Sequence, residues 1–135
     1  MALKSKETRL LIVDDEDTIR KLLSGRFTRE GFAVTVAEDG QKALDAAKAQ
    51  VPDVVITDVK MPGMDGFAFM EGLKAAGIDC PVVVVTGHGD KECAIEAMHK
   101  GAFDYLEKPF DMDSITYTVK RAVDRENLRR ANLRL

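Results

Sequence analysis

The feature that most constrains the fold of this chain is an alternation of short, mostly continuous apolar runs with longer amphipathic stretches. The apolar runs predict strands at residues 10–13, 32–37, 53–57, 82–86 and 103–106. The amphipathic stretches predict helices at residues 17–30, 39–50, 64–76, 90–100 and from 111 onward. Continuously apolar strands are typical of parallel sheets that helices cover on both faces. The alternation therefore predicts a doubly wound α/β sheet with right-handed crossovers.

The first predicted helix has marked ends. Its apolar residues, among them Leu23 and Phe27, recur at helical spacing along one face. Asp17 is expected as the N-cap, because an aspartate there can accept a hydrogen bond from the first turn. Gly31 is expected to end the helix.

Length, charge and cysteine content exclude several classes of protein. A chain of 135 residues fits one domain, and its net charge of -3 gives no general affinity for nucleic acids. The apolar run at 10–13 is too short for a signal peptide or a membrane span. Cys80 and Cys93 are too few for a disulfide framework and fit reduced thiols. We therefore expect a cytoplasmic protein that does not contact membranes.

Chemically distinctive residues follow four of the five predicted strands. They are Asp14-Asp15 after the first strand, Asp58 after the third, Thr86-Gly87 after the fourth and Lys108-Pro109 after the fifth. Function in open α/β sheets lies at the carboxyl ends of the strands, so these side chains are expected in one crevice. Three carboxylates there repel one another, and Mg²⁺ would relieve the repulsion. With an ammonium and a hydroxyl for phosphate oxygens, the set predicts phosphoryl transfer to an aspartate.

These residues resemble the receiver domain of two-component response regulators. The resemblance rests on Asp14-Asp15, the segment 58–66, the pair Thr86-Gly87 and the segment 108–110, and it extends over residues 8 to 125. It implies a flavodoxin-like (βα)5 fold with strand order 2-1-3-4-5. The charge pattern also resembles regulators in which a helix joins the receiver to an ATPase domain and a DNA-binding domain.

The resemblance implies a phosphoacceptor and a metal site. Asp58 would accept a phosphoryl group from the phosphohistidine of a sensor histidine kinase. Asp14, Asp15, Asp58 and the backbone carbonyl of Lys60 would hold Mg²⁺. The domain would catalyse its own phosphorylation and slow dephosphorylation, so it is expected to be a switch and not a conventional enzyme.

The resemblance also implies which residues bind phosphate. Thr86, the backbone N–H of Gly87 and the ammonium of Lys108 would contact the phosphoryl oxygens. The peptide bond between Lys108 and Pro109 would be cis, since X–Pro is the only common place for that isomer.

The resemblance also implies which residues switch the domain and which tune its reaction rates. Thr86 would move toward the phosphoryl group, and Tyr105 would rotate inward. The face built by the helix at 90–100, the strand at 103–106 and the last helix would carry the change to an output domain. Lys60 and His88 flank the path of the attacking water and would tune the rates.

The C-terminal segment carries no glycine or proline after Pro109, so helix is predicted to continue to residue 135. We expect a receiver domain at 1–125 and a helical linker at 126–135, leading to an output domain outside the sequence that acts in transcription. A solvated helical tail is the alternative. A homodimer would form through the face just described or through the C-terminal helix. Residues 120–135 carry six basic and two acidic residues, but without interleaved aromatic residues or a recognition motif no direct nucleic-acid contact is expected.

Three other functions compete with this hypothesis. A receiver could signal through protein contacts without phosphorylation, although every chemical position is filled here. An aspartyl-phosphate phosphatase would usually have a second acid two residues after the nucleophile, where this chain has Lys60. A flavin-binding protein would need a phosphate-binding loop after the first strand, where Asp14 and Asp15 would repel phosphate unless a metal intervened.

Overall fold

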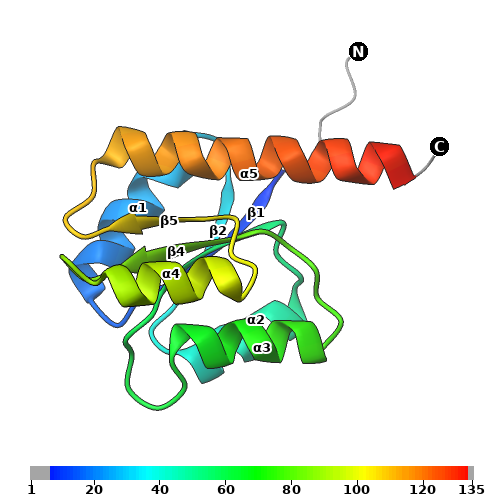
Figure 1. The fold of residues 1–135 in the computed structure, drawn as a ribbon. Coiled ribbons are helices and arrows are strands. Elements are labelled where there is room, and N and C mark those ends of the chain that lie inside the picture. The colour runs from blue at the N-terminus through cyan, green and yellow to red at the C-terminus, as the bar shows by residue number, and fades with distance from the viewer. Residues whose placement is uncertain (1–6, 134–135) are drawn as a thin grey trace.

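The computed structural model describes residues 7–133 and shows five strands alternating with five helices (Figure 1). The strands are β1 (Arg9–Val13), β2 (Ala33–Ala37), β3 (Val54–Asp58), β4 (Val82–Thr86) and β5 (Asp104–Glu107). The helices are α1 (Asp17–Arg29), α2 (Gly40–Ala49), α3 (Gly66–Ala75), α4 (Lys91–His99) and α5 (Met112–Leu133). All neighbouring strands are parallel, in the order β2-β1-β3-β4-β5. This confirms the predicted doubly wound fold and its strand order.

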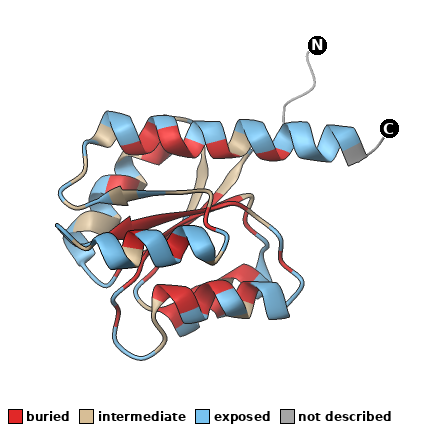
Figure 2. Ribbon diagram, in the orientation of Figure 1, coloured by how far each residue is buried: buried red, intermediate tan, exposed pale blue. Residues whose placement is uncertain are grey.

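The sheet is covered on both faces because alternate strand residues point to opposite sides. Leu10 and Ile12 of β1 pack with α1 and α5, whereas Leu11 and Val13 pack with α2, α3 and α4. Figure 2 shows the result as buried residues along the inner sides of the helices and through the central strands. Strands that are buried on both faces, as β3 and β4 are, have few polar positions, which explains their mostly continuous apolar runs in the sequence.

The start of α1 differs from the prediction. Its N-cap is Glu16, whose side chain makes no capping hydrogen bond, and Asp17 is the first helical residue. The reason lies in Asp14, whose Oδ1 accepts a hydrogen bond from the N–H of Glu16 at 2.8 Å. This bond fixes the backbone at Glu16, one residue before the predicted N-cap. Gly31 ends the helix as predicted, with a φ of 95° that favours glycine.

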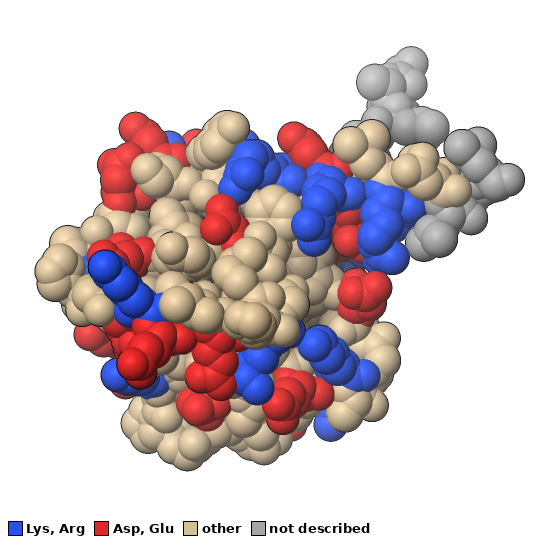
Figure 3. Space-filling model, viewed as in Figure 1, with Lys and Arg blue, Asp and Glu red and all other residues tan. Residues whose placement is uncertain are grey.

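The last helix is longer than the sheet that it covers. α5 has 22 residues and extends past the sheet (Figure 1). Figure 3 shows a cluster of basic side chains along the part of the helix near its C-terminal end. The helix passes through residue 125 without a break, so the linker at 126–135 remains a prediction, and its last two residues lie outside the described part. No helix within residues 7–133 combines the length and the apolar character that a membrane span requires.

Ion pairs hold the end of α5 against the body of the domain. Glu126 is only 7% exposed and pairs with Arg129 at 2.6 Å and Arg130 at 3.3 Å. Arg129 also lies 3.2 Å from Asp79, and Arg130 lies 3.5 Å from Asp53. The hydrogen bond from Arg129 lowers the pKa of Glu126, while burial opposes this shift. Glu126 therefore links two arginines that reach two separate loops.

Replacing Glu126 with glutamine is expected to lower the free energy of unfolding by about 0.5 to 1 kcal/mol, because partly solvated ion pairs contribute little each. The pKa of Glu126 is lower in the folded state, so its contribution is present above the ordinary value of 4.5 and disappears as the pH falls through the depressed value. Urea unfolding of both proteins at neutral and acidic pH measures this. A difference that grows on acidification would contradict the assignment.

Candidate functional site

Three carboxylates meet at the carboxyl end of the central strands. Asp14 and Asp15 follow β1, Asp58 is the last residue of β3, and one oxygen of each lies within 4.8 Å of the others. Asp14 is 2% exposed, whereas Asp15 is exposed. Burial is the largest effect on Asp14 and raises its pKa, and the charge of Asp58 adds to this. The N–H of Glu16 and the ammonium of Lys108 oppose the shift, so the cluster carries repulsion that a cation relieves.

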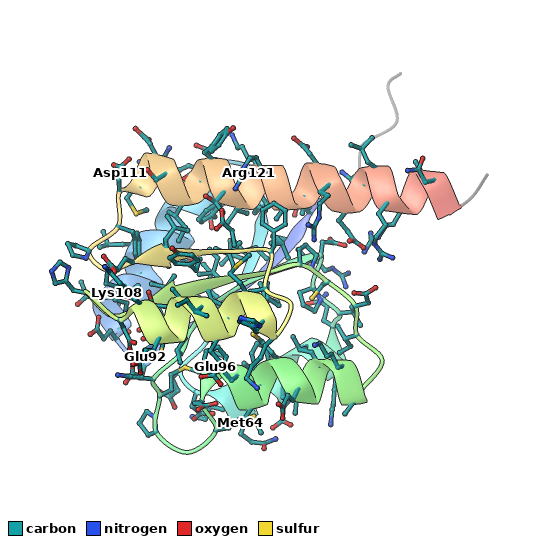
Figure 4. All side chains as sticks on the ribbon, in the orientation of Figure 1. Met64, Glu92, Glu96, Lys108, Asp111 and Arg121 are labelled. Carbon is teal, nitrogen blue, oxygen red and sulfur yellow. The ribbon has the colours of Figure 1, made fainter. Side chains whose placement is uncertain are left out.

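Lys108 follows β5 at the end of the sheet (Figure 4), and its ammonium contacts two of these carboxylates. Its Nζ is 3.0 Å from Asp58 Oδ2, 3.1 Å from Asp14 Oδ2 and 3.7 Å from Glu16 Oε2. Burial alone would lower the pKa of Lys108, but the hydrogen bond and charge of Asp58, together with the charge of Asp14, outweigh it and raise the pKa. Lys108 is thus a fixed positive charge at the centre of the predicted site.

Asp58 is held so that one edge of its carboxylate faces the crevice. Its Oδ1 accepts from the N–H of Val59 at 2.8 Å, and its Oδ2 accepts from Lys108. The side chain is 10% exposed. Gly66 lies against its backbone, because a Cβ there would be 2.2 Å from the carbonyl oxygen of Asp58. The loop after β3 therefore folds tightly back over the strand end, which only glycine permits at this position.

The ends of β4 and β5 complete the crevice. The carbonyl of Thr86 accepts from the N–H of Lys108 at 2.8 Å, and Thr86 itself is 1% exposed. The Lys108–Pro109 bond is cis, as predicted. A Cβ at Gly87 would meet no atom within 4 Å, so the backbone there borders open space. The four strand ends named from the sequence thus lie around one opening.

The cluster fits a hard divalent cation. Carboxylate oxygens are the ligands that Mg²⁺ prefers, and few protein ligands suffice because the ion keeps several waters. Asp14, Asp15 and Asp58 supply such oxygens close together. The position of Lys108 among them indicates independently that the cluster attracts positive charge. The backbone carbonyl of Lys60 remains a predicted ligand.

The predicted switch and rate residues lie around the site. Tyr105 is 42% exposed and lines a hollow between β5 and α4. His88 is exposed in the loop after β4. The ammonium of Lys60 lies 3.1 Å from Asp90, whose hydrogen bond and charge raise the pKa of Lys60.

The sequence analysis assigned no role to three residues that lie at the site. Glu16 is the third carboxylate that Lys108 approaches, and its place after the acidic pair was the only signal available. Arg20 donates to the backbone carbonyl of Asp14 at 2.7 Å, one helical turn after the N-cap. Asp90 caps α4, which an aspartate before an amphipathic stretch indicates, but its pairing with Lys60 depends on the fold of two loops.

Two apolar hollows flank the crevice. One, of about 490 Å³, adjoins Lys108 between α1 and the start of α5. Its remaining lining residues are Ile19, Leu22, Gly87, His88, Pro109, Phe110 and Met112. The other, of about 480 Å³, lies between α4 and β5, with Ile95, Met98 and Tyr105 in its lining. Apolar hollows next to a charged site are typical of surfaces that bind other proteins.

Comparisons with known proteins match most of the chain. The family model of the response regulator receiver domain matches residues 10–120 of this chain. The DNA-binding transcriptional regulator NtrC of Klebsiella pneumoniae is 43% identical over 112 residues, which is 83% of this chain and 24% of that protein. The chain thus spans about a quarter of the length of the curated relatives that it matches first.

Solved structures agree with this match. A response regulator receiver domain protein from Clostridium thermocellum superposes with a TM-score of 0.83 at 33% identity, covering 90% of this chain and 98% of that one. NtrX from Brucella abortus superposes with a TM-score of 0.88 at 36% identity, covering 96% of this chain and 30% of that one. Together with the acidic crevice and its lysine, these matches show that the chain belongs to the receiver-domain family of two-component response regulators.

Proposed function

We propose that the chain is a phosphoaccepting switch in which Asp58 takes a phosphoryl group. The observation that carries the proposal is the ammonium of Lys108, which joins Asp58 to Asp14 within a crevice that Asp15 and Thr86 border. A nucleophilic carboxylate with cationic groups around it is the arrangement that phosphoryl transfer requires, since catalysis there is positioning and charge neutralisation.

The chemistry uses the carboxylate of Asp58 directly. An oxygen of Asp58 attacks the phosphorus of a phosphohistidine, the bond from phosphorus to nitrogen breaks, and an aspartyl phosphate forms. Thr86, the N–H of Gly87 and Lys108 bind the phosphoryl oxygens. Asp14, Asp15, Asp58 and the carbonyl of Lys60 would hold Mg²⁺, which would supply positive charge that neutralises the transferring phosphoryl group. Slow hydrolysis restores the carboxylate, so the domain promotes its own reactions without turning over a separate substrate.

The phosphodonor is a sensor histidine kinase. The apolar hollow between α1 and the start of α5 supports this, because it opens beside Lys108 and offers the exposed side chain of Leu22 to a helical partner. A protein docked there would bring its phosphohistidine to the crevice without crossing the rest of the surface. The cytoplasmic location expected from the sequence remains a prediction.

The face built by α4, β5 and α5 transmits the change caused by phosphorylation to an output domain. Ile95, Tyr105 and Tyr117 are 60%, 42% and 66% exposed on α4, β5 and α5, and neighbouring exposed apolar side chains are typical of surfaces that bind other proteins. Movement of Thr86 toward the phosphoryl group would let Tyr105 turn inward and change this surface, which favours a homodimer or contact with an output domain. The relative named as a DNA-binding transcriptional regulator supports an output in transcription.

Adding beryllofluoride with Mg²⁺, which mimics an aspartyl phosphate, is expected to shift the amide NMR signals of Thr86, Gly87 and Tyr105. Amides at the amino ends of the strands should keep their positions, because the change is confined to the crevice and the α4–β5–α5 face. Shifts only at Asp58 and its neighbours would show phosphate mimicry without switching. That result would favour a receiver that acts through protein contacts independently of phosphorylation.

A further inference from the structure

An ion pair joins the two loops that flank Asp58. Lys60 lies in the loop after β3, two residues beyond the acceptor, and Asp90 lies in the loop after β4, four residues beyond Thr86. Lys60 Nζ is 3.1 Å from Asp90 Oδ2. The loop after β3 carries the carbonyl of Lys60, which is expected to bind the metal. The loop after β4 carries the N–H of Gly87, which is expected to bind a phosphoryl oxygen. The pair therefore closes a bridge across one side of the crevice.

Asp90 is anchored on its own side of the bridge. Its Oδ1 accepts from the N–H of Cys93 at 3.2 Å as the N-cap of α4, and its own N–H donates to the carbonyl of Gly87 at 3.1 Å. The side chain of Asp90 is 21% exposed, whereas that of Lys60 is 79% exposed. A long, exposed lysine side chain is otherwise free to sample many rotamers. The fixed partner is thus Asp90, and the positioned one is Lys60.

We propose that Asp90 is a positioning residue that lengthens the lifetime of the aspartyl phosphate by holding Lys60 across the path of the attacking water. The inference rests on the proposed function, because it concerns the hydrolysis of phosphorylated Asp58. In that step the oxygen of water attacks phosphorus and the bond to the Asp58 oxygen breaks. Inorganic phosphate leaves, the carboxylate is restored and one proton passes to bulk water.

The effect is expected to be moderate and dependent on salt. Solvent-exposed ion pairs are weak and are screened by salt, so loss of this one should shorten the half-life by about two- to fivefold. The same screening should shorten the half-life of the unaltered protein as ionic strength rises, and should affect variants without the pair much less. A purely structural role of Asp90 in capping α4 would not produce this salt dependence.

The test compares variants that break the pair from either side. Asp90→Asn removes the charge but keeps the cap, because asparagine is as good an N-cap as aspartate. Lys60→Gln removes the other charge and leaves the backbone carbonyl in place. Each protein is phosphorylated with acetyl phosphate and Mg²⁺, the donor is removed by desalting, and loss of the phosphoryl group is followed by intact mass.

Both single variants are expected to lose the phosphoryl group about two- to fivefold faster, and the double variant no faster than either one. Lys60→Arg keeps the charge and should keep the original half-life. Lys91→Gln should also leave the half-life unchanged, because Lys91 makes no ion pair with any of the described residues. Unchanged half-lives in the single variants, or effects that multiply in the double variant, would overturn the inference while leaving the phosphoacceptor role intact. Failure of the unaltered protein to accept a phosphoryl group would instead refute both.

Discussion

Replacing Asp58 with asparagine will abolish phosphorylation of the chain. The amide is not a nucleophile toward phosphorus, and the neighbouring carboxylates are in different positions, since Asp14 is buried against Lys108 and the N–H of Glu16. Intact mass after incubation with Mg²⁺ and acetyl phosphate measures the result. No added phosphoryl group should be detectable in the variant at times when the unaltered protein is largely modified.

The matched control for this variant is Asp65→Asn, which makes the same chemical change in the same loop. Asp65 caps α3 by accepting from the N–H of Ala68 at 2.8 Å, and asparagine can cap in the same way. This control should be phosphorylated as fully as the unaltered protein. A phosphorylated Asp58→Asn protein would show that another residue is the acceptor.

Replacing Lys108 with alanine will leave an acceptor that is phosphorylated but does not switch. Asp58 keeps its carboxylate, but the phosphoryl oxygens lose the ammonium that would bind them, so the response of Thr86 to beryllofluoride should be largely lost. The metal-free variant should also be less stable by about 2 kcal/mol, because Asp14 and Asp58 are left without their cation. This is below the range for fully buried pairs, since the Lys108 side chain is 21% exposed.

Two measurements check the Lys108 variant. Urea unfolding with and without Mg²⁺ should show a larger stabilisation by the metal in Lys108→Ala than in the unaltered protein, because the ammonium no longer competes for the same carboxylates. The control is Lys120→Ala, which removes an ammonium paired with Glu30 at the surface. Equal stability of Lys108→Ala and the unaltered protein, or an unchanged response at Thr86, would contradict the role assigned to Lys108.

The sheet and its site could be predicted because both depend on strand order and burial. The runs before Asp58 and Thr86 are apolar except for Thr57, because helices cover both faces, so each strand and its end could be located. Parallel strands all end at the same edge, which places Asp14, Asp58 and Lys108 at one end of the sheet, although the loop after β5 decides how far the side chain of Lys108 reaches. Their roles came from the resemblance to receivers, and the structure supplied the distances.

Contacts between loops could not be predicted in the same way. The pairing of Lys60 with Asp90, and of Arg130 with Asp53, joins residues far apart in sequence through side chains on irregular backbone. No periodicity links such positions, and charges near a surface have many possible partners. The N-cap of α1 shows the same limit on a smaller scale, because a local hydrogen bond to Asp14 moved the helix start from the residue that the pattern favoured.

The most direct test of the phosphoacceptor role is the intact mass of the chain after incubation with acetyl phosphate, with Mg²⁺ in one sample and with EDTA in the other. We expect the mass of one phosphoryl group to be added in the presence of Mg²⁺, and no change with EDTA or in Asp58→Asn. An unchanged mass in the presence of Mg²⁺, from a chain that circular dichroism shows to be folded, would contradict the proposal that Asp58 is a phosphoacceptor.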